Sequence, residues 1–204
     1  MPERTSIWLR TGKPVRGRPA LDRDRIVAAA VTLLDEESAS GLTMRKLADR
    51  LGAPPMTLYG YVATKDDVLE YAVDAVFAET LEDDDTGGDW RDALTSIGTR
   101  TFEALLRHHW AAPLIGGTPP LGPAAVAQFG TILRVLTAAG FHGERLEAVT
   151  TGFYYYVLGA ALAESAWARA GHPAVEMLSG YAGTDSGARF QRGLSAVLEG
   201  LRPA

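Results

Sequence analysis

The chain has 204 residues, of which 47% are hydrophobic and none is cysteine, and its formal net charge is −5. This length allows one large or two small domains. The absence of cysteine excludes a disulfide framework, a thiolate zinc site and a cysteine nucleophile. The longest apolar run, residues 152–163, is shorter than the ~20 residues that a membrane span needs. The N-terminus shows no signal-peptide pattern, so we expect a cytoplasmic protein without a membrane partner.

The charges are distributed unevenly along the chain. Residues 1–65 hold eleven Lys or Arg and seven Asp or Glu, whereas the remainder holds nine Arg and eighteen acids. A small basic region before a larger acidic one is typical of a module that contacts a polyanion joined to one that does not. Asymmetric surface charge without a function would look the same, so this pattern needs support from a motif.

The hydrophobic spacing predicts an all-α fold with an N-terminal head of short helices. Residues 1–20 are expected to form a flexible basic arm, broken by glycine and proline. Helices are predicted over residues 22–37, 44–51, 54–62 and 64–79, with Asp22, Thr43 and Thr64 as N-caps. Gly52 is expected at a left-handed C-cap. The predicted core of the head contains Leu47, Leu51, Leu58 and Val62.

The rest of the chain is predicted to be a larger helical module. Helices are expected over residues 90–110, 124–139, 144–170 and 187–201, with loops over 82–88 and, because of its Gly and Pro content, 113–123. Residues 174–186 show no clear pattern. The predicted domains are therefore the arm (1–20), a helix-turn-helix domain (21–66) and a ligand-binding and dimerisation domain (67–204).

Two short helices joined by a glycine-containing turn, within residues 42–65, predict a helix-turn-helix. Its second helix would enter the major groove of double-stranded DNA. The side chains suit that task, because hydroxyl, phenol and cationic groups bind phosphates or base edges and apolar groups contact thymine methyls. The candidates are Thr43, Met44, Arg45, Pro55, Met56, Thr57, Tyr59, Tyr61 and Lys65. A helical corner without DNA contacts is the alternative.

The run from Asp22 to Glu79, with GLTMRKLADRLG and TLYGYVATKDDVLE, resembles the DNA-binding domain of the tetracycline-repressor (TetR) family. Residues 108–163 are similar to the C-terminal core of the tetracycline-repressor branch. The resemblance implies a homodimeric, ligand-responsive transcriptional repressor in which Arg45, Pro55, Met56, Thr57, Tyr59, Tyr61 and Lys65 face a palindromic operator. Met44 and Pro55 depart from that branch, so its operator sequence does not transfer.

The arm contains Arg16-Gly17-Arg18-Pro19, which resembles a short element that enters narrow A·T-rich minor grooves. Paired arginines are attracted by the negative potential there. A tail that makes only loose phosphate contacts is the equal alternative for Arg16 and Arg18.

Aromatic side chains of the larger module predict a small-molecule pocket. A long helix carrying Tyr154-Tyr155-Tyr156 needs polar partners or a cavity for its phenols. The expected effector is small and largely apolar. The candidate lining residues are Phe102, His109, Phe129, Tyr154, Tyr155 and Trp167. Plain core packing is the alternative for each of them, and a DNA-binding dimer without effector sensing is the alternative for the whole module.

Dimerisation is expected through the long helix and the last one, in an intersubunit four-helix bundle. Small residues on the long helix allow close approach, and an apolar stripe on the last helix would pack beside them. These residues are Gly152, Gly159, Ala163, Phe190, Leu194, Val197 and Leu201. The alternative is that the stripe covers the core of its own subunit.

A helical enzyme in which His108, His109 and Glu164 act as acid/base or metal-binding residues is a further alternative that we disfavour. Adjacent histidines on a helix point about 100° apart, and no nucleophile with a neighbouring base is apparent. We expect no metal, no cofactor and no enzymatic activity.

Overall fold

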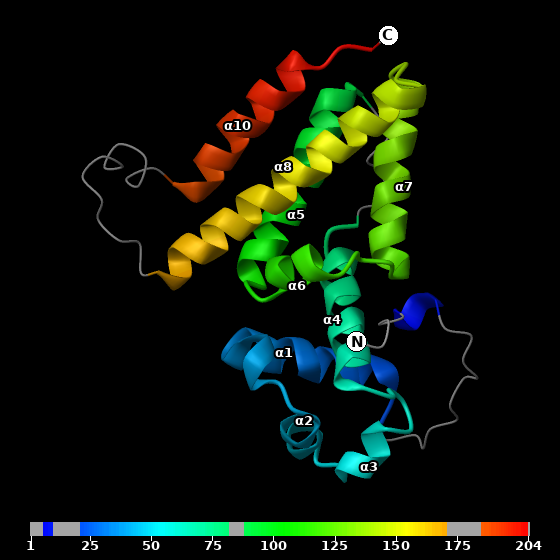
Figure 1. Cartoon of the computed structure of the whole chain (residues 1–204), viewed down its shortest axis with the longest axis vertical. Helices are drawn as coiled ribbons and strands as arrows, with labels where there is room; N and C mark the ends of the chain where they lie inside the picture. Colours follow the sequence, from blue (N-terminus) through cyan, green and yellow to red (C-terminus); the bar gives the residue numbers. More distant parts are fainter. Residues whose placement is uncertain (1–5, 10–20, 82–87, 171–184, 204) are drawn as a thin grey trace. The chain divides into compact units, whose positions relative to one another are not determined.

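The computed structural model describes residues 6–9, 21–81, 88–170 and 185–203, and these parts are all helical (Figure 1). The predicted fold class is therefore confirmed. No helix in these ranges is long and apolar enough to cross a membrane. The elements are η1 (Ile7–Leu9), α1 (Arg23–Gly41), α2 (Met44–Leu51), α3 (Pro55–Leu58), α4 (Lys65–Ala78), α5 (Trp90–Arg107), α6 (Ala111–Gly117), α7 (Pro123–Ala138), α8 (Gly143–Arg169) and α10 (Ser186–Gly200).

The chain divides into two compact units. The first comprises Met1–Ala78 and His108–Val126, and the second comprises Glu79–Arg107 and Ala127–Ala204. The first unit thus holds α1 to α4 together with α6. The functional boundary that we placed at residue 66 stays a prediction.

α1 and α2 begin at their predicted N-caps, and α2 ends at its predicted C-cap. The Asp22 carboxylate accepts a hydrogen bond from the Arg25 N–H at 2.8 Å, and the Thr43 hydroxyl accepts one from the Lys46 N–H at 3.2 Å. Gly52 adopts φ 62° and ψ 31°, and its N–H bonds to the Ala48 and Asp49 carbonyls. A side chain with Cβ is disfavoured in this left-handed conformation, which explains the glycine in the turn.

The core of the first unit is formed where α1 packs against α4. The buried apolar residues are Ile26, Ala30, Leu33 and Leu34 of α1 and Val68, Leu69, Ala72, Val73, Val76 and Phe77 of α4. Three of the four predicted core residues, Leu47, Leu58 and Val62, are at most 2% exposed, and Leu51 is half-buried. These contacts attach the short α2 and α3 to the longer helices.

α4 is fixed at its first turn by a reciprocal cap. The Asp67 N–H donates to the Thr64 hydroxyl oxygen at 3.1 Å, while the Asp67 carboxylate accepts from the Ala63 and Thr64 N–H groups. The two side chains also share a hydrogen bond at 2.7 Å. This arrangement satisfies N–H groups that a helix start leaves unpaired.

Two further carboxylates of the first unit join α1 and α4 to the later segment of the same unit. Asp35 Oδ1 is 2.8 Å from His108 Nδ1 and accepts from Trp110 Nε1 at 2.6 Å. Asp74 Oδ1 accepts from the Ala124 and Ala125 N–H groups, both at 3.0 Å, at the start of α7.

In the second unit, α5 packs against both α8 and α10 (Figure 1). The Phe102 ring stacks on Phe190 with centroids 4.1 Å apart. A Cβ at position 193 would lie 2.2 Å from the Tyr156 hydroxyl oxygen, so Gly193 allows α8 and α10 to approach there. The second unit is therefore held together by aromatic packing between its helices.

Several predicted boundaries were wrong. The segment 113–123, predicted as a loop, begins within α6, because Leu114 and Ile115 supply apolar packing that offsets its glycines. The third helix ends at Leu58 instead of near residue 62, and the fifth ends at Arg107 instead of residue 110. α1 extends to Gly41 across a kink at Ser38, where φ is 62°. Residues 174–184 and the arm with Arg16 and Arg18 lie outside the described residues.

We predict that Asp74 makes stability depend on pH. Burial raises the pKa of Asp74, with the Ala124 and Ala125 N–H groups acting in the opposite direction. Between the ordinary and the raised pKa, the folded chain binds more protons than the unfolded chain, so stability falls as pH rises. Urea unfolding from about pH 4 to pH 7 should show wild type losing stability relative to Asp74→Asn as pH rises. Exposed Glu103→Gln is the control, and a pH-independent difference for Asp74→Asn contradicts the assignment.

Candidate nucleic-acid interface

The surface of α3 presents the side chains predicted to contact DNA. Met56 is 78% exposed and Tyr59 is 47% exposed, whereas Leu58 between them is fully buried. Pro55 and Thr57 are also exposed. Burial of Leu58 anchors the short helix to the head and turns the other side chains toward solvent. One face of α3 is thus free to enter a groove.

Arg45 is the cation of α2 best placed for DNA. It is exposed, and no described residue pairs with it. The other two cations of α2 are already paired with α1, since Lys46 forms an ion pair with Glu37 and Arg50 with Glu36. The hydrogen bond from Arg50 lowers the pKa of Glu36.

Thr43 and Met44, also predicted to contact DNA, lie at the start of the same helix. Thr43 is exposed, but its hydroxyl oxygen accepts the capping hydrogen bond from Lys46. Met44 is half-buried. A DNA contact of Thr43 therefore has to share the hydroxyl with the cap.

Two of the predicted contacts are engaged inside the head. The Tyr61 hydroxyl donates to the Leu21 carbonyl at 2.7 Å, and Lys65 Nζ donates to the Ala39 carbonyl at 2.9 Å. A phosphate accepts hydrogen bonds, so Tyr61 has to leave Leu21 to bind one. Lys65 keeps two further N–H donors and can bind a phosphate without that exchange. No local pattern in the sequence predicted either internal hydrogen bond.

A second candidate site is a groove between α8 and α10 in the second unit. Of the predicted ligand residues, Phe102 and Tyr155 line it. Its other lining residues are Tyr156, Gly159, Ala160, Ala163, Glu164, Ser186, Arg189, Phe190 and Gly193. Glu164 and Arg189 form an ion pair that is 15% and 14% exposed. The aromatic run 154–156 on one long helix was the sequence signal for this groove.

The remaining predicted ligand residues do not line this groove. Phe129 is 47% exposed on α7, and Trp167 is half-buried on α8. Tyr154 is half-buried, and burial raises its pKa, with a smaller effect of Tyr155. His109 belongs to the first unit, where its Nε2 lies 3.1 Å from the Ser38 hydroxyl oxygen.

The residues considered for a metal site have separate partners. His108 pairs with Asp35, and Glu164 pairs with Arg189. In the described part of the chain, no three His, Asp or Glu side chains are grouped to hold a metal ion.

The predicted dimer residues fall into three groups by their exposure. Gly152, Gly159 and Ala163 are exposed on α8. Phe190 and Leu194 of α10 are only 3% and 0% exposed, because they pack within their own chain. The burial of these two side chains agrees with the alternative that the apolar stripe of the last helix covers the core of its own chain. Val197 and Leu201 are half-buried.

Comparison with known proteins supports the helix-turn-helix assignment. Residues 26–72 match the family model "Bacterial regulatory proteins, tetR family". Residues 82–204, more than half of the chain, match "Tetracyclin repressor-like, C-terminal domain". The chain belongs to the TetR family. It is thus a DNA-binding transcriptional regulator, and its C-terminal half is of the type found in tetracycline repressors.

Individual TetR-family relatives extend this result. The chain is 43% identical over 162 residues to an HTH-type transcriptional regulator of Saccharopolyspora erythraea, covering 79% of this chain and 69% of the relative. It is 34% identical over 157 residues to the HTH-type transcriptional repressor DrrR1 of Streptomyces coeruleorubidus, covering 76% of this chain but only 58% of DrrR1. The structure of Streptomyces coelicolor ActR in complex with actinorhodin matches with a TM-score of 0.74 at 26% identity, covering 88% of this chain and 96% of ActR.

We predict that Arg45 contributes directly to DNA affinity. Arg45→Ala should weaken binding roughly tenfold and make the slope of log affinity against log salt shallower by about 0.9 if the contact is to a phosphate. Fluorescence anisotropy with labelled duplex measures both quantities. Arg134→Ala is the matched control, because Arg134 is an exposed arginine of the second unit. Equal affinities of the Arg45 variant and the control would show that α2 does not contact DNA.

Proposed function

We propose that this TetR-family regulator is a repressor that binds a palindromic operator as a homodimer and is released by a small, largely apolar effector. The observation that carries the proposal is the exposed face of α3 in the capped α2–turn–α3 unit. Because its relative DrrR1 is a transcriptional repressor, we propose repression as the direction of regulation.

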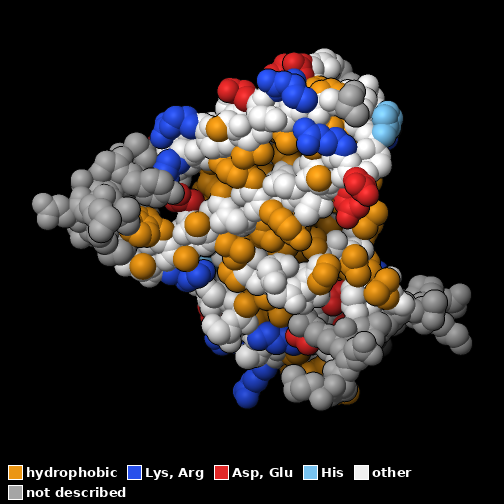
Figure 2. All heavy atoms as spheres, turned by 45° about the horizontal axis from the view of Figure 1, so that its top comes forward, with side chains coloured by type: hydrophobic (Ala, Val, Ile, Leu, Met, Phe, Trp, Pro, Cys, Tyr) orange, Lys and Arg blue, Asp and Glu red, His pale blue; other side chains and the backbone are white. Residues whose placement is uncertain are grey.

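Dimerisation is supported by the outer surface of α8. Gly152, Gly159 and Ala163 are exposed there, and Tyr155 between them is 67% exposed. A Cβ built at Gly152 or Gly159 meets nothing within 4 Å, so another helix has room to approach. Figure 2 shows hydrophobic side chains at the surface in patches among charged ones. Two heads are needed to read half-sites that lie roughly 34–36 Å apart.

The effector is assigned to the groove between α8 and α10. The stacked Phe102 and Phe190 rings give it an aromatic wall, and the Glu164–Arg189 pair gives it polar groups that can fix a ligand's orientation. Gly159 and Ala163 line the groove as well as the proposed dimer surface. A partner helix would thus adjoin the effector site.

Release would follow from a population shift. In one state of the dimer the two heads would be spaced to fit the operator, and in the other they would not. An effector that binds the second state more tightly lowers operator affinity, at most by the ratio of its affinities for the two states. A coupling of about 1–3 kcal/mol would change the affinity roughly 5–150-fold. The second candidate, a DNA-binding dimer without effector sensing, gains support if molecules shown to bind the groove, beginning with actinorhodin as a probe, leave operator affinity unchanged.

We predict that Ala163→Arg dissociates the dimer. The added guanidinium would be buried without a partner against the second copy, which opposes association. Light scattering at micromolar concentration should show dimers for wild type and monomers for the variant, with loss of operator binding. Ala168→Arg is the control, because Ala168 is exposed on the same helix but about 140° around its axis from position 163. A monomeric wild type, or two variants that behave alike, contradicts the proposed interface.

A further inference from the structure

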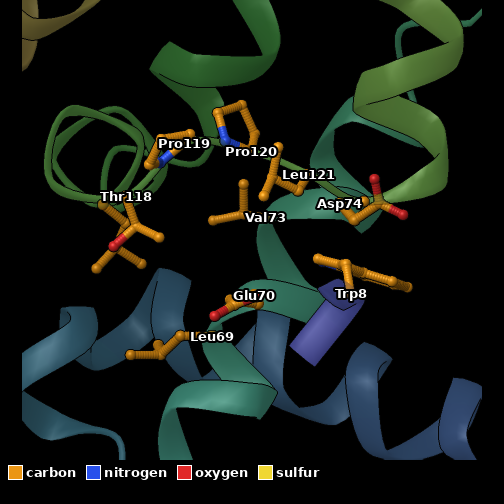
Figure 3. A pocket seen from close by; sticks show the side chains of 11 residues that line it. Trp8, Leu69, Glu70, Val73, Asp74, Thr118, Pro119, Pro120 and Leu121 are labelled. Atoms are coloured by element: carbon orange, nitrogen blue, oxygen red, sulfur yellow. The ribbon is translucent and has the colours of Figure 1, made fainter. Parts of the chain in front are cut away.

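A cavity in the first unit is formed by three separate segments of the chain (Figure 3). The cavity is partly open to solvent, and its enclosed volume of about 60 Å³ exceeds the space of a single water molecule, so a larger ligand extends toward the open side. It shares no residue with the groove between α8 and α10. Its walls are Trp8 of η1, Leu69, Glu70, Val73 and Asp74 of α4, Leu114 of α6, and residues 118–122.

The wall formed by Trp8 is held in place by α4. Glu70 Oε2 accepts hydrogen bonds from the Ser6 hydroxyl and from the Ile7 N–H, the latter at 3.1 Å. The Trp8 ring meets the Tyr71 ring edge-on with centroids 4.9 Å apart. The Arg23 guanidinium carbon also lies 5.0 Å from the Tyr71 centroid. Trp8 is thus a positioned aromatic wall.

The wall formed by residues 118–122 is fixed through Asp74. Its carboxylate binds the Ala124 and Ala125 N–H groups and, in Figure 3, points away from the centre of the cavity. A Cβ at Gly122 would lie 2.2 Å from the Asp74 carboxylate, so this glycine permits the close approach. The turn and α4 therefore form one rigid side of the cavity.

The chemistry of the walls selects the charge of a ligand. Leu69, Val73 and Leu121 are apolar, and none of the lining residues in the described part of the chain is a lysine or arginine. Glu70 Oε2 accepts its hydrogen bonds from the N-terminal segment. The other carboxylate oxygen, Oε1, receives no hydrogen bond from the described part of the chain. The carboxylates of Glu70 and Asp74 disfavour an anion. An indole wall beside a carboxylate instead favours an organic cation, through a cation–π contact and a charge-assisted hydrogen bond.

We propose that this cavity is a binding site for a compact apolar ammonium ion. The ammonium group would donate to Glu70 Oε1 beside the Trp8 ring, and its apolar substituent would lie against Val73, Leu121 and the two prolines at 119 and 120. This site is separate from the proposed effector groove between α8 and α10. Binding of a cation to it can be measured on the protein alone, without DNA.

Benzylammonium tests this site, with benzyl alcohol as a neutral molecule of the same shape. Isothermal titration calorimetry on the full chain should show saturable binding of benzylammonium and at least tenfold weaker binding of benzyl alcohol. Glu70→Gln should weaken benzylammonium binding about tenfold and reduce its preference over benzyl alcohol. Exposed Glu103→Gln should bind as wild type does.

Because Glu70→Gln also alters the bonds to Ser6 and Ile7, a second variant and a direct measurement complete the test. Trp8→Leu keeps the carboxylate and should weaken binding about fivefold. Magnetisation transfer between bound benzylammonium and the methyl groups of Val73 and Leu121 should locate the ligand. The absence of saturable binding, unchanged affinity in Glu70→Gln and Trp8→Leu, or contacts only to other methyl groups would each overturn the proposal.

Discussion

The packing of α1 against α4 is the constraint on which the DNA-facing surface depends. α3 has only four residues and cannot be stable alone, because a helix of that length forms too few internal hydrogen bonds. Its position comes from Leu58, which is buried in the core that α1 and α4 build. The Thr43 and Asp67 caps then fix where α2 and α4 begin. Exposure of Met56 and Tyr59 is a consequence of this anchoring.

Two carboxylates join the helices of the first unit to the segment 108–126. Asp35 binds His108 and Trp110, and Asp74 binds the first N–H groups of α7. Each carboxylate contacts two polar groups of that segment, so loss of one carboxylate removes two polar interactions at once. Such contacts give α1 and α4 defined partners outside α2 and α3.

Local sequence signals predicted most of the fold. Asp22, Thr43 and Gly52 mark helix ends through bonds to residues within five positions, so their roles follow from the sequence alone. α6 was missed because its glycines and proline outweigh its short apolar pattern, and packing in the folded chain decides its conformation. Docking of residues 6–9 on Glu70 joins positions more than sixty residues apart and has no local signal.

In the candidate sites too, some features follow from local sequence and others depend on tertiary contacts. Residue types on α3 predicted an exposed polar and apolar face, and the structure places Pro55, Met56, Thr57 and Tyr59 at the surface. The bonds of Tyr61 to Leu21 and of Lys65 to Ala39 depend on tertiary contacts, so spacing did not reveal them. An apolar stripe on α10 is equally compatible with an interface and with a core. Only burial distinguishes them, and it assigns Phe190 and Leu194 to the core.

Selection of bound duplexes from a random pool, followed by a salt series on the enriched sequence, tests the central claim most directly. We expect a palindrome with half-sites about one helical turn apart. Wild type and Arg134→Ala should bind it equally well, and Arg45→Ala should bind it more weakly. Failure to enrich any sequence, with only weak binding that disappears as salt rises, would contradict sequence-specific recognition by α3.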